Sequence, residues 1–182
     1  MEGSAYKKMV LVITNDSTVF LKKNGISSAF EMFGGRMQEV KNLVARLDLA
    51  QKNGHKMCEV SFGIVTSHFG YIPANYTVAD CNPSEIMSCK EDYEKVQKEK
   101  DYLNMIRSTS RAFDRIIVCV PKDMLSMMIK DGTLPVGKVI AVTSKDLQNE
   151  CEKRDWTFLE RKGARVGTNN ADRIFELING IC

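Results

Sequence analysis

The hydrophobic residues of this chain follow two alternating patterns. Short apolar runs at residues 9–13, 62–66, 115–120 and 138–142 are rich in β-branched side chains, which is typical of strands buried on both faces. Between these runs, apolar residues recur every three or four positions, as they do along one face of a helix. This alternation predicts a three-layer α/β fold, a mostly parallel open sheet flanked by helices in the Rossmann-like manner.

The same pattern sets the bounds of the predicted elements. A helix is predicted over residues 36–53, ended by a glycine, and a second periodic stretch covers 86–106. A long loop containing Pro73 and Pro83 is predicted to join the strand at 62–66 to this stretch. The remaining predicted elements are a helix that follows Pro121, a helix capped by Ser144, a strand at 157–160 and a closing helix at 169–179.

Length and composition narrow the class of protein. A chain of 182 residues without an internal repeat or linker predicts one domain over 1–182. The net charge of +3 arises from 26 basic and 23 acidic residues, which is too even to indicate nucleic acid by itself. Its six cysteines include no Cys-x-x-Cys pair, so we expect buried thiols and no metal site. Without a long apolar segment, we expect a cytoplasmic protein with no membrane partner.

Polar residues follow several of the predicted strands. Thr14, Asn15 and Asp16 come directly after the first strand, and the segments 66–68 and 143–144 follow two later ones. Because the carboxyl ends of parallel strands share one edge of a sheet, we expect these loops to surround a common ligand site. In this interpretation Thr14, Asn15 and Asp16 bind the ligand, with Asn15 and Asp16 contacting a sugar or base.

The segment after the second buried strand carries the catalytic candidates. His68 is one of only two histidines in the chain, and a neutral imidazole accepts and returns a proton near physiological pH. Ser67 and Thr66 are candidate nucleophiles or hydrogen-bonding groups, and Gly70 belongs to the same predicted binding loop. Adjacent residues on an extended chain point apart, so their proximity in sequence does not by itself build a Ser67-His68 dyad.

Two glycine-containing segments are candidate anion sites. Arg36 follows two glycines at the start of the predicted helix 36–53, where free backbone N–H groups and a guanidinium suit a phosphate or carboxylate. Arg165, Thr168 and Asn169 belong to a basic loop that leads into the closing helix, which suits a phosphate or a nucleic-acid backbone. The alternatives are a simple sharp turn for the first segment and a solvated surface loop for the second.

The strand followed by Thr66-Ser67-His68-Phe69-Gly70 resembles the strand end of an uncharacterised family of small phage and microbial α/β proteins, in which a strand ends in Ser-Ala-Lys-x-Gly-Leu. Thr66 and Gly70 match this motif in type, whereas Ser67 and His68 stand where the family has Ala-Lys. The segment 28–35 resembles the family's approach to its first long helix. The resemblance covers the first half of the chain and implies a three-layer α/β fold in nucleic-acid or nucleobase metabolism.

Two functions of different class follow from these residues. The first is an enzyme that binds a nucleotide, nucleoside or nucleobase, with the catalytic residues at 66–68 and a phosphate held by Arg36 or Arg165. The second is a binding module for a ligand or nucleic acid that uses Arg161, Lys162 and Arg165. A third interpretation is a self-associating domain that buries a partner on the 86–106 stripe. Cofactor, reaction class and oligomeric state stay open at this point.

Overall fold

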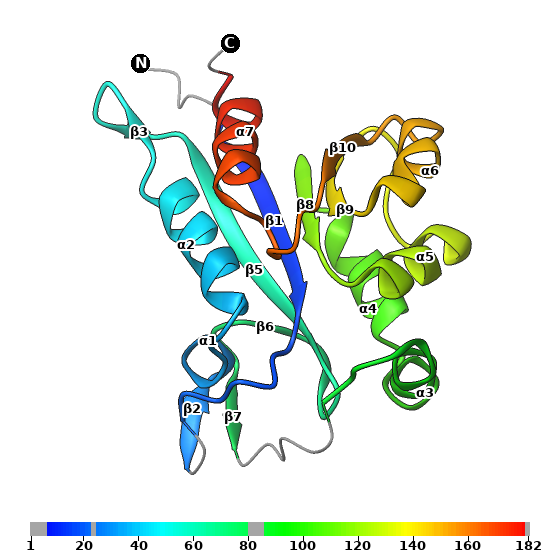
Figure 1. Cartoon of the computed structure of the whole chain (residues 1–182). Coiled ribbons are helices and arrows are strands. Elements are labelled where there is room, and N and C mark those ends of the chain that lie inside the picture. Colours follow the sequence, from blue (N-terminus) through cyan, green and yellow to red (C-terminus); the bar gives the residue numbers. More distant parts are fainter. Residues whose placement is uncertain (1–6, 23–24, 80–85, 181–182) are drawn as a thin grey trace.

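A parallel sheet forms the centre of the molecule. The computed structural model describes residues 7–22, 25–79 and 86–180, and within them the main sheet has six strands in the order β10-β9-β8-β1-β5-β6 (Figure 1). The strands are β1 (Lys8–Asn15), β5 (Cys58–Thr66), β6 (Gly70–Pro73), β8 (Arg115–Cys119), β9 (Val139–Thr143) and β10 (Thr157–Glu160). All neighbours pair in parallel except β5 and β6. The predicted mostly parallel α/β sheet is confirmed.

Helices cover both faces of this sheet (Figure 1). The helices α2 (Met37–Asp48) and α7 (Thr168–Asn179) lie on one face, and their buried residues form one apolar cluster with that face of the strands. The other face packs against α3 (Lys90–Lys100), α4 (Tyr102–Ser110), α5 (Lys122–Asp131) and α6 (Gln148–Glu152), which is preceded by a 3-10 turn at Lys145–Leu147. The short helix α1 (Ala29–Met32) lies before α2 in the chain. The strands β2 (Ile26–Ser28) and β7 (Thr77–Ala79) pair antiparallel in a small separate sheet.

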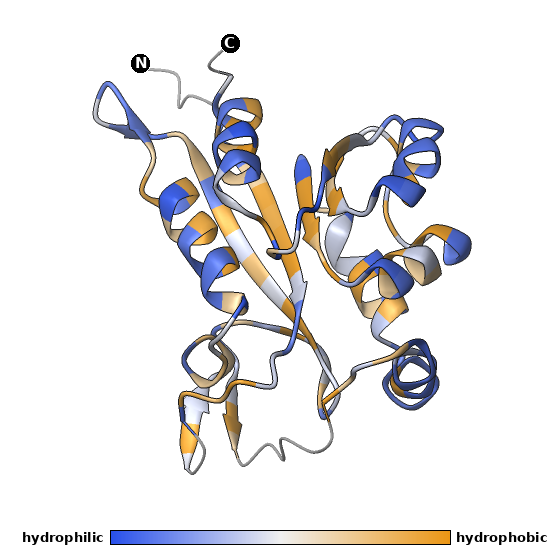
Figure 2. Cartoon of the chain, in the orientation of Figure 1, coloured by the Kyte–Doolittle hydropathy of each residue, from blue (hydrophilic) through white to orange (hydrophobic). Residues whose placement is uncertain are grey.

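The central strands are apolar on both sides because both of their faces are covered. Val10 and Val12 of β1 belong to the α2 and α7 cluster, whereas Leu11 and Ile13 belong to the cluster on the opposite face. Figure 2 shows the consequence, with β1 and β8 strongly hydrophobic and the outward face of α3 hydrophilic. Each such side chain contributes roughly 1.5–3 kcal/mol when it is fully buried, so the sheet is the main source of stability.

The predicted helix over 36–53 is shorter in the structure. It ends at Asp48, and residues up to 56 form a hairpin of β3 (Gln51–Lys52) and β4 (His55–Lys56). The two turn residues between these strands, Asn53 and Gly54, both have positive φ, at 52° and 78°. An Asn-Gly pair adopts this conformation readily and closes a two-residue hairpin, so the glycine marks a turn rather than the end of the helix.

The predicted loop after residue 66 is also wrong in its first part. Residues 70–73 form β6, which returns antiparallel to β5 and forms the edge of the sheet. Gly70 opens this strand at a φ of 71°, which favours glycine. Pro73 lies at the end of the edge strand, where its missing N–H disrupts little pairing. Pro83 lies outside the described residues.

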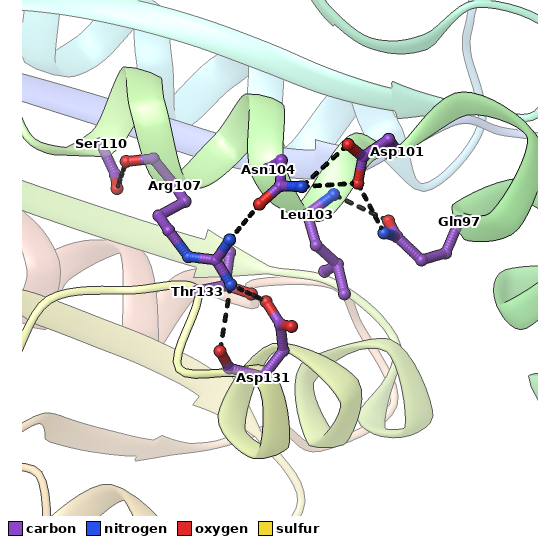
Figure 3. Close-up of polar contacts among 8 residues, drawn as sticks. All are labelled: Gln97, Asp101, Leu103, Asn104, Arg107, Ser110, Asp131 and Thr133. Carbon is purple, nitrogen blue, oxygen red and sulfur yellow. Dashed lines mark hydrogen bonds and ion pairs between the residues drawn. The ribbon is translucent and has the colours of Figure 1, made fainter.

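The periodic stretch over 86–106 is divided into two helices. Asp101 separates α3 from α4 and has a φ of 51°, a conformation that aspartate tolerates because its short side chain bonds locally. Its carboxylate accepts hydrogen bonds from Gln97 Nε2 and Asn104 Nδ2 (Figure 3). The apolar stripe therefore packs against the sheet in two segments at an angle.

In the described part of the chain, no helix has the length and hydrophobicity needed to cross a membrane.

Candidate functional site

The carboxyl edge of the sheet contains a point where the chain reverses direction. From the central strand β1 the chain builds β5 and β6 on one side, and it then returns to place β8 on the other side of β1. The Thr14 hydroxyl links the ends of these two strands by donating to the Cys119 carbonyl at 2.8 Å. Open α/β sheets bind ligands in the crevice at such a switch point, so this edge is the candidate site.

The segment 161–167 crosses this edge on its way from β10 to α7 (Figure 1). Arg165 lies over the end of β1 and is only 8% exposed. Its Nη1 donates to Thr14 Oγ1 at 3.0 Å and to the Asn15 carbonyl at 2.5 Å, and its Nη2 donates to the Asp16 carbonyl at 2.7 Å. Burial lowers the pKa of Arg165 to about 10, so the guanidinium is charged at neutral pH. Arg165 therefore holds the loop after β1 in place.

Asp16 is the most perturbed acid at this edge. The residue is 1% exposed, and its Oδ2 accepts the backbone N–H of Ser67 at 2.9 Å. Its Oδ1 is buried with no hydrogen-bond partner among the described residues. Burial raises the pKa of Asp16 from 3.8 to about 6, although the Ser67 N–H and the charge of Arg165 oppose the change. A carboxyl group with this pKa exchanges its proton near physiological pH, as acid–base catalysts do.

Two further arginines lie close to Arg165 along the 161–167 segment. Arg161 donates from Nε to the Ala164 carbonyl at 3.0 Å and from Nη1 to the Val120 carbonyl at 3.3 Å. Arg36 donates from Nη1 to the Gly163 carbonyl at 3.1 Å. We define Arg36, Arg161 and Arg165 as the arginine cluster.

No member of the arginine cluster forms an ion pair within 4 Å with a described carboxylate. The members also repel one another. The charge of Arg161 lowers the pKa of Arg165, and the charge of Arg36 lowers the pKa of Arg161, in both cases after burial. The charges of Asp16 and Glu39 offset only part of these effects on Arg165. Neighbouring cations of this kind favour the binding of an anion.

Glu39 joins the two helices at this edge. Its Oε2 accepts the backbone N–H groups of Val166 and Gly167 at 3.1 and 3.3 Å. The first turn of α2 is thereby fastened to the start of α7. This role was not predicted, because a glutamate in the first turn of a helix is ordinarily explained by the helix dipole. No signal in the sequence indicates its partner 127 residues away.

Thr168 and Asn169 lie in the first turn of α7, for which Gly167 is the N-cap residue without a side-chain cap bond. They line a cavity of about 380 Å³ together with Lys162, whose side chain is 81% exposed. This cavity is distinct from the buried contacts of Arg165. Within the basic loop, the structure thus separates an exposed lysine from a buried, structural arginine.

The predicted catalytic residues Thr66, Ser67 and His68 also lie in different environments. The Thr66 hydroxyl donates to the Gly70 carbonyl and accepts from the Phe69 N–H, both at 2.9 Å, so it stabilises the turn between β5 and β6. His68 is exposed, and its ring packs edge-on against Phe69 with 4.6 Å between centroids. Ser67 and His68 line a polar cavity of about 610 Å³ whose opposite wall is α3.

The structure therefore brings Thr14, Asn15, Asp16, Ser67 and Arg165 together at the carboxyl edge of β1. Arg36 contacts the 161–167 segment through its hydrogen bond to the Gly163 carbonyl. The imidazole at 68 and the first turn of α7 border two other cavities.

The cysteines of the described chain are free thiols. Cys58, Cys119 and Cys151 are buried, Cys89 is exposed, and Cys81 and Cys182 lie outside the described residues. Burial raises the pKa of the Cys119 thiol to about 12, which disfavours a nucleophilic thiolate. The described residues contain no group of three or more His, Cys, Asp or Glu side chains with the arrangement of a metal site.

No protein-family model, curated protein or solved structure matches the chain.

Proposed function

We propose that this protein is a nucleotide-binding enzyme whose ligand occupies the carboxyl edge of the sheet, with the phosphate held by Arg36 and Arg161 and a proton carried by Asp16. The observation that supports this proposal most directly is the arginine cluster, which lies at the switch point of the sheet and forms no ion pair within 4 Å with a described carboxylate. Natural proteins rarely place neighbouring guanidinium groups together without compensation, because desolvation and repulsion both cost stability.

The donors that remain open on the arginine cluster favour a phosphate. Among the described residues, the hydrogen bonds of Arg36 use only Nη1, and those of Arg161 use Nε and Nη1. Each of these two side chains therefore keeps N–H groups for an incoming oxyanion, and guanidinium groups match phosphate oxygens in geometry and charge. In Arg165, by contrast, both terminal nitrogens donate hydrogen bonds to residues 14–16.

Asn15 and Asp16 favour a ligand that also carries hydrogen-bonding groups of a nucleoside. The Asn15 side chain makes no hydrogen bond with any described residue, although the residue is only 6% exposed. An amide both donates and accepts, which suits a sugar hydroxyl or the edge of a base. The free Oδ1 of Asp16 adds an acceptor when the group is ionised, or a proton donor when it is protonated.

The alternative function, a nucleic-acid-binding module, depends on cations that reach solvent. In the basic loop, Lys162 meets this requirement with its 81% exposed side chain. Arg165 does not, since it is 8% exposed and bonded to backbone carbonyls. Contacts with a nucleic-acid backbone require several exposed cations along a surface, so the small phosphorylated ligand is the better supported of the two.

The test is calorimetric titration of the purified chain with nucleoside monophosphates, nucleoside triphosphates, the parent nucleosides and inorganic phosphate. We expect at least one nucleotide to bind more tightly than its nucleoside. Arg161→Gln removes a charged hydrogen-bond donor, which corresponds to roughly a 10- to 100-fold loss of affinity. The matched control is Arg173→Gln, since Arg173 lies on α7 and pairs only with Glu176 among the described residues.

Two results contradict the proposal. One is the absence of binding by every nucleotide at millimolar concentration. The other is equal affinity for the Arg161→Gln and Arg173→Gln variants. Tight binding of short single-stranded nucleic acid that weakens steeply with salt, and that is lost in a Lys162→Gln variant, would favour the binding module instead.

A further inference from the structure

A further cavity lies on the sheet face beside α4, away from the arginine cluster. It has a volume of about 610 Å³ and is bounded by residues of β1, β5 and β6 on one side and by α4 on the other. Its apolar wall includes Leu11, Phe62, Met105 and Phe113. We call it the α4 cavity. None of its lining residues belongs to the candidate site described above, and none carries a charge.

The buried polar side chain that lines the α4 cavity is Tyr71. Tyr71 of β6 lines the cavity and is 5% exposed, yet its hydroxyl makes no hydrogen bond with any described residue. The neighbouring strand makes room for this hydroxyl. A Cβ atom on Gly63 would lie 2.2 Å from Tyr71 Oη, so the phenol rests directly on the backbone of β5. A buried tyrosine hydroxyl ordinarily finds a partner.

Burial raises the pKa of Tyr71 above its ordinary value of 10. The phenol therefore keeps its proton at all physiological pH values and is able to donate a hydrogen bond. The absence of charged groups among the lining residues means that an ionised ligand would lose its hydration without gaining a counter-charge. The complementary occupant is a neutral, mainly apolar molecule that carries one acceptor oxygen.

The α4 wall is connected to its neighbouring helices by side-chain hydrogen bonds. Arg107 bonds to Asn104 on its own helix and to Asp131 at the end of α5, while Asp101 bonds to Asn104 from the start of the helix (Figure 3). Thr133 donates to the same Asp131 carboxylate at 2.8 Å. This network links α4 to α3 and α5, which favours a preformed cavity, as is usual for small-molecule sites.

We propose that the α4 cavity binds a neutral, apolar small molecule whose carbonyl or ether oxygen accepts a hydrogen bond from the Tyr71 hydroxyl. This site is independent of the proposed nucleotide site, since the two share no residue. A mainly apolar cavity with a few polar groups is the usual composition of a site for a small organic ligand.

The experiment uses two probes that differ in the acceptor alone, acetophenone and ethylbenzene, with the full chain. Binding is followed by NMR of the methionine methyl groups, with the Met105 signal identified in a Met105→Leu variant. We expect acetophenone to shift the Met105 signal and to bind more tightly than ethylbenzene. In Tyr71→Phe, acetophenone should lose roughly 2- to 10-fold in affinity, the range of one neutral hydrogen bond, while ethylbenzene should bind unchanged.

A variant that fills the α4 cavity tests whether the two probes bind there or elsewhere on the protein. Ser61 lines the cavity and is exposed, so Ser61→Trp should fold normally and prevent both probes from shifting the signal of Met105. The proposal is overturned if neither probe shifts the Met105 signal, if Tyr71→Phe affects both probes equally, or if binding persists in Ser61→Trp. Nucleotide titrations give the same affinity in Tyr71→Phe whichever result is found, so failure here is distinguishable from failure of the proposed nucleotide site.

Discussion

Replacement of Asp16 by asparagine is the most direct test of the charge balance at the carboxyl edge of the sheet. The side chain keeps its shape, and the amide oxygen still accepts the Ser67 N–H that now reaches Oδ2 at 2.9 Å. What disappears is the ability to ionise. The substitution therefore separates the cost of the buried charge from the packing of the loop after β1.

The magnitude follows from the pKa of Asp16, which burial raises from 3.8 to about 6. The folded state binds this proton more tightly than the unfolded state does. The stabilisation is therefore complete below pH 3.8 and is lost as the pH rises through about 6. Each factor of ten in proton affinity corresponds to about 1.4 kcal/mol, so at pH 7 the ionised carboxylate costs the wild-type protein about 3 kcal/mol.

The variant should therefore gain stability relative to the wild type as the pH increases. Near pH 4 we expect the two proteins to be similar, or the variant slightly weaker, because its amide nitrogen takes the place of the unpartnered Oδ1. Between pH 4 and pH 7 the difference in the free energy of unfolding should change by about 2 kcal/mol in favour of Asp16→Asn, because part of the stabilisation is already lost at pH 4.

Urea denaturation at pH 4, 5, 6 and 7 measures this difference. Trp156, the only tryptophan of the chain and 5% exposed, reports unfolding by its fluorescence. Asp146→Asn is the control, since Asp146 is exposed and Lys122 holds its pKa below the usual value. That control should lose stability relative to wild type above pH 4, the opposite sign. A difference for Asp16→Asn that is constant from pH 4 to pH 7 would refute the reasoning.

Two further substitutions test the packing around the proposed sites. Arg165→Met leaves the carbonyls at the end of β1 without their donors, which should lower the free energy of unfolding by about 2–5 kcal/mol in urea denaturation; an effect no larger than that of Arg173→Met would contradict the assigned role. Gly63→Ala places a methyl group against the Tyr71 ring and should cost about 1–3 kcal/mol in the same assay, and this cost should shrink in a Tyr71→Val background.

The sequence predicted the strands well where burial alone determines the pattern. The runs at 115–120 and 138–142 correspond to β8 and β9, because strands covered on both faces need apolar residues at every position. The element bounds failed where local turn chemistry competes with periodicity. The Asn-Gly pair at 53–54 closes a hairpin, and Asp101 interrupts an otherwise continuous helical stripe.

The gathering of the loop after β1 was predictable for the same topological reason. Parallel strands place their carboxyl ends together, and Asp16 does meet Ser67 at this edge. The role of Arg165 was not predictable. A basic residue between two glycines is expected to be exposed to solvent. Arg165 is buried because the 161–167 segment crosses the edge of the sheet. Contacts such as Glu39 with Val166 depend on that path and leave no local signal.

The location of the unfavourable groups supports a functional interpretation of this edge. A chain selected for stability alone would replace a buried carboxyl that costs about 3 kcal/mol at neutral pH, and it would pair its arginines with acids. Here Asp16 and the arginine cluster lie together at the point where the sheet changes direction. Local departures from what stability favours concentrate at functional sites. An oxyanion bound by Arg36 and Arg161 would relieve the repulsion between the guanidinium groups, and its negative charge would raise the pKa of Asp16 further. Under the proposed function, ligand binding and proton uptake would therefore be coupled through Asp16, Arg36 and Arg161.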